Sequence, residues 1–360
     1  MTQYNISYIE NTKNFGDNLD LSEFKKWSVS KCSVGKHNNK LSLVVIPIIA
    51  SLGGKIAKIS DRDNEFHQSI IEKLEVIPGF CSGIPLNNFI SQLRDVGISV
   101  VGNSTKTIKT DNVALNNDVV LLAYSLIAQE LAKGVYNIIF DIQIGPNEPI
   151  KTIEEAQLFC DTVKLIGDSY NRKVTVFVSD LNFPIGKSVG HKFEVQEAIK
   201  ILNGSITDGD FYDACLSYSS NIASVLYNVP EEIGLRLVLS TLKNGIAYKT
   251  FQRWIQTQGG DLKTLNNYSP NQKQIEILSK SNGIINIDIN KLREVNRIMP
   301  NSAGIIFDRN NGDRVSSGDR ICTIYANDSI TIEKIKRLIN QSISVSFKNM
   351  TSKNHFCTMY

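Results

Sequence analysis

Cys32 is the side chain in this sequence best placed to act as a nucleophile, because Lys31 directly precedes it. A neighbouring cation lowers the pKa of a thiol, and the thiolate is the nucleophilic form. The other interpretation makes Cys32 a small apolar residue that fills space in a core. His37 could act as its base only if the chain between them folds back. Cys32 is therefore a speculative catalytic residue.

The other cysteines and the histidines suggest neither a disulfide framework nor a metal site. Six cysteines and four histidines are scattered over 360 residues, without a CxxC pair or the spacing of metal ligands. The start of the chain lacks the basic end and apolar run of a signal peptide, and no stretch has the ~20 apolar residues that cross a bilayer. We expect reduced thiols, no metal, no cofactor and a cytoplasmic location.

The composition is typical of a globular protein with a substantial core. Hydrophobic residues make up 42% of the chain and charged residues 21%, and the formal net charge is +3. Such a small net charge gives no field that would attract nucleic acid or an anionic membrane. We therefore expect neither as a partner.

The elements that would position these side chains alternate between strands and helices. Strand-like runs occupy 55–60, 96–102, 135–145 and 173–181, and helical patterns occupy 41–54, 153–170, 191–204 and most of 208–258. Strand, helix and strand at this spacing are typical of a βαβ unit with parallel strands. Glu194 and Glu197 are interpreted as residues that keep a helix soluble. Beyond a polar break at 268–274, short strands and one helix near 330–342 predict a small α+β domain.

Several segments together resemble the pyrimidine-nucleoside and thymidine phosphorylases. They are GGKIAKIS with EKLEVIPGF (53–60, 72–80), DLNFPIGKSVGHKFEVQEAI (180–199), FQRWIQTQGGD (251–261) and GDRVSSGDRICTIYAND (312–328). Their shared order and spacing carry the resemblance, since each alone is common. It implies the fold of nucleoside phosphorylase class II. Residues 1–270 would form a large mixed-sheet α/β domain with a reduced helical lobe near 103–134, and 271–360 a small α+β domain. It also implies attack of phosphate on C1′ of a nucleoside.

The phosphate side of the family's site is partly retained. The family's phosphate loop corresponds to KCSVGKHNNKLS, and the matched positions are Lys31, Ser33, Gly35, Ser42 and, downstream, Ser60. In such a loop, glycines let backbone N–H groups approach an anion, hydroxyls donate to it and a lysine neutralises it. The resemblance therefore implies an anion site at these residues. The alternative is that they are ordinary turn and capping residues.

Fewer of the family's substrate-binding residues than of its phosphate-binding residues are retained. Arg62 and Ser125 remain as candidates for substrate binding, whereas Thr110, Gln129 and Gln143 stand where the family has Arg, Lys and Lys. Threonine offers neither the charge nor the reach of an arginine that reads a carbonyl. By the same resemblance, we expect no counterpart of the leading helices through which the family dimerises. We therefore expect a partner protein or a new homo-oligomer to cover that apolar surface.

Three functions stay open at this point. The chain could be a repurposed enzyme that binds phosphate or an anionic small molecule and does not carry out ordinary nucleoside phosphorolysis. It could be a non-catalytic scaffold or a subunit of a multiprotein complex. It could also be an active pentosyltransferase with altered specificity. The sequence names no substrate.

Overall fold

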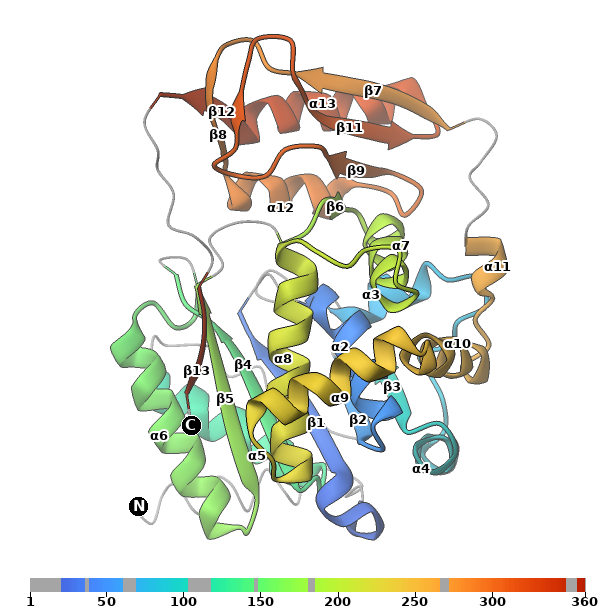
Figure 1. The fold of residues 1–360 in the computed structure, drawn as a ribbon, viewed down its shortest axis with the longest axis vertical. Helices are drawn as coiled ribbons and strands as arrows, with labels where there is room; N and C mark the ends of the chain where they lie inside the picture. Colours follow the sequence, from blue (N-terminus) through green and yellow to red (C-terminus); the bar gives the residue numbers. More distant parts are fainter. Residues whose placement is uncertain are drawn as a thin grey trace.

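The computed structural model describes residues 21–35, 39–60, 69–102, 118–145, 148–180, 185–265 and 272–347, together with the backbone of 355–359. A larger α/β body lies below a smaller body in the view of Figure 1. The division at 270 and the helical lobe near 103–134 stay predictions, since much of that lobe lies outside the described residues.

A mixed six-stranded sheet forms the centre of the larger body, in the order β13-β5-β4-β1-β2-β3. Its strands are β1 (Ser28–Val34), β2 (Lys55–Ser60), β3 (Ile98–Gly102), β4 (Asn137–Gln143), β5 (Lys173–Asp180) and β13 (His355–Met359). Strands β1 to β5 run parallel, and β13 pairs antiparallel with β5. Every residue of β4 is buried, as expected for a strand covered on both faces. The predicted mixed-sheet α/β fold is confirmed.

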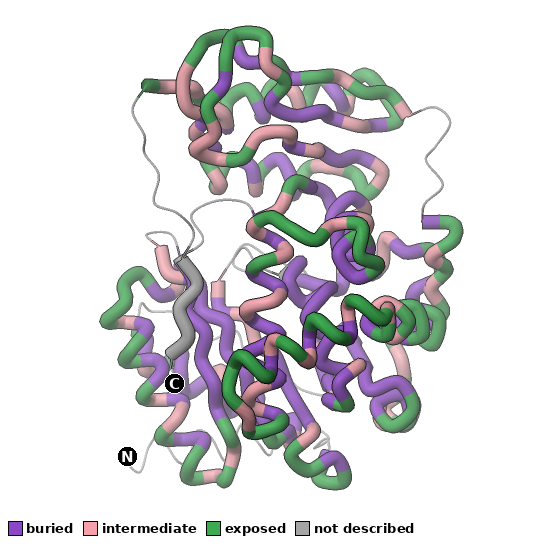
Figure 2. The backbone as a smooth tube through the Cα atoms, in the orientation of Figure 1, coloured by how far each residue is buried: buried purple, intermediate pink, exposed green. Residues whose placement is uncertain are grey.

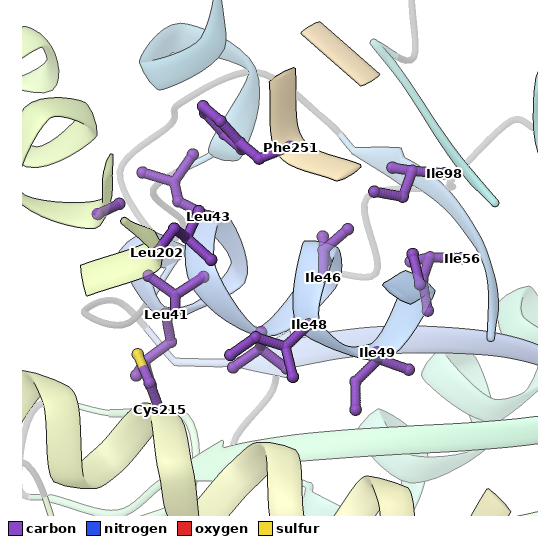
Figure 3. Packing of buried hydrophobic residues seen from close by; sticks show 14 of the residues in the cluster. Leu41, Leu43, Ile46, Ile48, Ile49, Ile56, Ile98, Leu202, Cys215 and Phe251 are labelled. Carbon is purple, nitrogen blue, oxygen red and sulfur yellow. The ribbon is translucent and has the colours of Figure 1, made fainter. Parts of the chain in front are cut away.

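Helices cover both faces of this sheet and create two hydrophobic clusters, which appear as purple tube in Figure 2. The first cluster contains α2 (Asn39–Ser51), α3 (Ile70–Glu75), α7 (His191–Leu202), α8 (Asp210–Tyr227), α9 (Glu231–Lys243), α10 (Ile246–Thr257) and α11 (Leu262–Leu265). The second contains η1 (Ser22–Trp27), α4 (Leu86–Asp95), α5 (Val119–Ala132) and α6 (Ile153–Ser169). In Figure 3, Leu41 of α2 lies beside Leu202 and Cys215, and Ile46 lies on the side of α2 toward Ile56 and Ile98. Helix α2 is thus the central helix on its face.

The smaller body contains two antiparallel sheets, of order β10-β8-β12 and β6-β9-β11-β7. Its elements are β7 (Lys273–Leu278), β8 (Gly283–Ile287), α12 (Ile289–Ile298), β9 (Gly304–Phe307), β10 (Arg314–Val315), β11 (Arg320–Ala326), α13 (Ser329–Ser342) and β12 (Ile343–Ser346). They enclose a third hydrophobic cluster. Strand β6 (Ser188–Val189) joins one of these sheets although it directly precedes α7 in the chain.

Most of the local predictions are confirmed. Strand β2 spans the predicted 55–60, and α6 begins at Ile153, where the predicted helical pattern begins. Thr152 is the N-cap of α6, and its hydroxyl accepts from the amide of Glu155. The expectation of one helix after residue 270 is wrong, because α12 precedes α13. Its signal was present: Asp288 is a capping residue that accepts from the amide of Lys291.

Two of the family-like segments pack directly against each other. Gln258 is a hub, since its Oε1 accepts from Trp254 Nε1 at 2.7 Å and its Nε2 donates to the carbonyl of Cys81 at 2.9 Å. A Cβ on Gly79 would lie 2.5 Å from the carbonyl oxygen of Gly259, and one on Gly259 would lie 2.7 Å from that of Gly79. Both glycines have positive φ, so no other residue fits this contact.

Candidate anion-binding site

The central strands diverge near the predicted anion-binding residues. Strand β1 pairs with β4 as far as Val34, but its pairing with β2 ends at Val29. Beyond that point, Lys58 of β2 donates from Nζ to the carbonyl oxygen of Lys31 at 3.0 Å. A lysine side chain thus satisfies a strand carbonyl that β2 no longer pairs. This happens toward the carboxyl ends of parallel strands, the edge at which α/β sheets bind ligands.

Lys31 forms a buried ion pair that compensates its charge. Its Nζ lies 2.6 Å from Oδ2 of Asp141 on β4 and 3.1 Å from the hydroxyl of Ser33. Tyr218 of α8 donates to Oδ1 of the same carboxylate at 2.5 Å. Burial, followed by the charge of Asp141, raises the pKa of Tyr218 well above its ordinary value. Lys31 keeps a third N–H for a ligand but adds little net charge.

Lys58 has no carboxylate partner in the part of the chain that the structure describes. It is 5% exposed, and its hydrogen bond goes to the carbonyl of Lys31. Burial, and then the neighbouring ammonium of Lys31, lower the pKa of Lys58 to about 8. At neutral pH the side chain remains mostly protonated. Glu130 attracts this ammonium and Lys133 repels it, but no carboxylate among the described residues forms an ion pair with it.

Hydroxyl groups lie near the two lysines. The side chains of Ser33 and Ser60 have the same strand parity as Lys31 and Lys58, so they face the same side of the sheet. The hydroxyl oxygen of Ser60 lies 3.2 Å from that of Ser69. Ser42 is buried on α2, and its Oγ has no hydrogen-bond partner within the described residues. A ligand or a water would recover the free energy that this unmet bond costs.

Gly35 ends β1 in a conformation that only glycine adopts easily. Its φ is 129°, and a Cβ at this position would lie 2.7 Å from Cβ of Gln143. The backbone at the end of β1 therefore packs on the side chain that ends β4.

Residues 28–34 form a strand, and this separates Cys32 from Lys31. Side chains alternate between the faces of a strand. Lys31 contacts Asp141 beneath α8 of the first cluster, whereas Cys32 packs against the second cluster. Burial, followed by the charge of Glu130, raises the pKa of Cys32 to about 12. The lowered pKa expected from Lys31 is wrong, because sequence neighbours in a strand point to opposite sides.

The substrate-binding candidates do not join this group. Ser125 is buried on α5, which covers the face of the sheet toward which Cys32 points. Arg62 lies outside the described residues. The structure thus gathers Lys31, Ser33, Gly35 and Ser60 at one edge of the sheet, with Ser42 on the adjacent α2. It places Ser125 behind the sheet.

The sequence interpretation missed two residues of the site, Lys58 and Asp141. Both are charged residues inside otherwise apolar strands, IAKIS and IIFDI. Lysine and aspartate are rarely buried unless they are paired or functional. This pattern was the available signal for both.

A second group of buried charges adjoins α2. Nζ of Lys40 lies 3.2 Å from Glu197 and donates to the carbonyl of Ser188 at 3.3 Å, and Lys73 pairs with Glu194 at 2.5 Å. Burial alone would raise the pKa of Glu194, but Lys73 and Lys40 outweigh it and lower the pKa. The interpretation of Glu194 and Glu197 as solubilising surface residues is wrong. They join α7 to α2 and α3.

Within the described ranges, no three His, Cys, Asp or Glu side chains gather in a metal-binding arrangement. None of the helices described is both long and apolar enough to cross a bilayer. Apart from the Asp141 carboxylate, which accepts from Lys31 and Tyr218, the polar side chains that gather at the sheet edge are ammonium and hydroxyl groups. These groups are hydrogen-bond donors to anions.

Comparison with known proteins identifies the relatives of this chain. The family model of the pyrimidine nucleoside phosphorylase C-terminal domain matches residues 298–346. The pyrimidine-nucleoside phosphorylase of Staphylococcus aureus strain USA300 is 28% identical over 358 residues, covering 92% of this chain and 82% of that protein. Over most of its length, the chain is similar to the pyrimidine-nucleoside phosphorylases. The protein of strain bovine RF122 / ET3-1 matches this chain equally, at 28% identity.

Solved structures agree with this family's fold. Anthranilate phosphoribosyltransferase from Thermus thermophilus superposes with a TM-score of 0.52 at 13% identity, over 69% of this chain and 83% of that one. A variant of the Saccharomyces cerevisiae enzyme in complex with 4-fluoroanthranilate gives 0.50 at 11% identity, over 71% and 79%. At such identities the likeness concerns the fold, and it is consistent with that of nucleoside phosphorylase class II.

Proposed function

We propose that this protein is a repurposed member of its family that binds phosphate or a phosphorylated small molecule at Lys31, Ser33, Lys58 and Ser60. Ser42 and the backbone at Gly35 complete the site. Ordinary phosphorolysis of thymidine or uridine lies outside its activity.

The observation that carries this proposal is the buried ammonium of Lys58. Burying an ammonium without a carboxylate costs several kcal/mol, and a bound anion would offset that cost. Lys31 is paired with Asp141 and therefore adds a hydrogen-bond donor to the site rather than net charge. Perturbed ionisable groups of this kind concentrate at functional sites.

The loss of phosphorolysis rests on the second half of the site. Gln143 packs on Gly35 at the position where the family resemblance places a lysine, so that position carries no charge. Ser125 and Cys32 belong to the opposite face of the sheet. Nucleoside cleavage requires donors aimed at the base and sugar as charge develops. The described residues that remain serve an anion rather than a pyrimidine.

A thermal-shift titration with phosphate, sulfate, ribose 1-phosphate and uridine tests the proposal. At a hundredfold excess over Kd, a bound ligand adds about 2.7 kcal/mol to the free energy of unfolding. We expect phosphate, sulfate and ribose 1-phosphate to raise Tm, and uridine alone to leave it unchanged. Uridine with phosphate should release no uracil.

Two lysine variants on β2 provide the control. Lys58→Met should abolish the shift, whereas Lys55→Met should keep it, because Lys55 donates to the carbonyl of Arg94 on the exposed surface. Equal shifts in both variants would show that the anion binds elsewhere. Phosphate-dependent release of uracil that Lys58→Met abolishes would favour an active phosphorylase. No shift with any anion would favour a scaffold.

A further inference from the structure

The smaller body is fixed to the larger one on one side, through β6 and α7. Val189 pairs antiparallel with Ile305 of β9, and the amide of Phe307 donates to the carbonyl of Lys187 at 2.8 Å. A Cβ on Gly304 would overlap the ring of Phe193. This junction is closely packed and leaves little room for sliding.

The smaller body also contacts the larger one through a pair of charged side chains that are too far apart for a hydrogen bond. Arg293 of α12 places Nη2 3.7 Å from Oε1 of Glu148, which follows β4. The two side chains are only 15% and 6% exposed. Nη2 has no hydrogen-bond partner within the described residues, and Nη1 reaches only Asn290 of the same helix, at 3.4 Å.

The pairing does not compensate Arg293 for its burial. Burial, which outweighs the attraction of Glu148, lowers the pKa of Arg293 to about 10. Charge-assisted N–H···O bonds span about 2.7–2.9 Å, so a relative movement of about 1 Å would complete this one. The contact is therefore desolvated but still open.

Glu148 is linked to the anion site through the end of β4. Its amide donates to the carbonyl of Gly145 at 3.0 Å, and the amide of Gly145 donates to the carbonyl of Ile150 at 3.2 Å. Two residues before Gly145, Gln143 packs on Gly35 at the end of β1. Glu148 is thus connected by backbone hydrogen bonds to the segment after β4, next to the Gln143 that packs on Gly35.

We propose that Arg293 is a positioning residue of the anion site and acts through Glu148. When an anion fills the site, the smaller body turns about its junction at β6 and β9, and Nη2 forms a direct hydrogen bond with Glu148. The completed contact holds Gln143 against Gly35. This inference rests on the anion binding proposed above.

Sulfate affinity of the full chain tests the inference. We expect Arg293→Met and Glu148→Gln each to weaken sulfate binding roughly five- to tenfold, the lower range of coupling between linked sites. The double variant should lose no more than either single one, because the two changes remove the same contact. It also buries no unpaired charge, so it remains informative if a single variant folds poorly.

Arg320→Met is the matched control. Arg320 is an arginine of the same body that pairs with Asp308 and Glu276 on the exposed surface, and its removal should leave sulfate affinity unchanged. Sulfate should also slow hydrogen exchange in α12 of the wild type but not of Arg293→Met.

The outcomes separate the two proposals. If Arg293→Met lowers Tm and leaves sulfate affinity within twofold, Arg293 is only a structural contact and the inference fails while the anion site stands. If the wild type binds no sulfate, the anion site and the inference fail together.

Discussion

Two buried lysines show how far environment changes one residue type. Lys31 and Lys58 are 3% and 5% exposed, yet Lys31 pairs with Asp141, whereas Lys58 bonds to a carbonyl and forms no ion pair within the described residues. Desolvation therefore affects the charge state of Lys58 far more. In the proposed anion site, we therefore expect Lys58 to decide the affinity.

Sulfate binding should depend on pH through Lys58. An anion favours the protonated lysine, so affinity should be constant well below pH 8 and fall up to about tenfold per pH unit above it. Without ligand the sign is opposite: the folded-state pKa is below the model-compound value of 10.5, so the free energy of unfolding rises between about pH 8 and 10.5. Calorimetric titrations from pH 6 to 10 measure the first effect. Lys58→Arg, which stays charged, should flatten the profile, and an unchanged slope would assign it to another group.

Cys32 should be unreactive at neutral pH. Its pKa is raised to about 12, so the thiolate fraction is minute. Brief treatment with iodoacetamide at pH 7.5 followed by mass mapping should modify Cys81, which is exposed, and spare Cys32. Faster modification of Cys32 than of Cys81 would restore the nucleophile hypothesis.

At the scale of elements, the segments that carry the family resemblance are largely structural. The IPGF segment ends just before Cys81, whose amide donates to the carbonyl of Gln258. The QGGD segment contains Gln258 and Gly259, and Gly259 contacts Gly79. Such contacts depend on the approach of two backbones rather than on chemistry. They can persist in a relative whose activity has changed.

Gly79→Ala should destabilise the larger body strongly. A Cβ there would meet the carbonyl of Gly259 at 2.5 Å in a backbone with φ of 80°. Backbone strain alone costs roughly 1–3 kcal/mol, and the collision adds to it. Urea unfolding measures the loss. Gly83→Ala is the control, since nothing lies within 4 Å of its Cβ; equal losses in both would contradict the packing argument.

At the scale of the molecule, the smaller body is joined to the larger one by shared structure and not only by the chain. Strand β6 belongs to the larger body by sequence and to the smaller body's sheet by pairing. The proposed turn of this body depends on the anchored side and on the 3.7 Å contact between Arg293 and Glu148. Its placement above the strand ends is visible in Figure 1.

Gly304→Ala should loosen this junction specifically. The new Cβ would overlap the ring of Phe193, so β9 must move away from α7. We expect faster hydrogen exchange in β6 and β9 and a lower Tm, with exchange in β4 unchanged. Ser302→Ala, in the preceding turn, should behave as wild type. Uniformly faster exchange would indicate global destabilisation instead.

Many of the helices and strands could be predicted from the sequence, because the spacing of apolar residues and the capping residues depend on only a few neighbouring positions. The run at β4 and the cap at Thr152 needed no tertiary information. The polar sequence SVSKCSV (28–34) was not predicted to be a strand, because it lacks the apolar pattern of a buried one. In the structure it is a largely buried strand. Without the strand, the sequence predicted that Lys31 and Cys32 lie on the same side of the chain.

The sequence by itself determined the family resemblance, the α/β class and most residues of the proposed anion site, since these follow from local pattern and from segments in a fixed order. Only the tertiary structure decided which charges are compensated. Asp141 reaches Lys31 across 110 positions of sequence, and no such partner reaches Lys58 among the described residues. Electrostatic free energy depends on distance and burial in space, and spacing along the chain fixes neither.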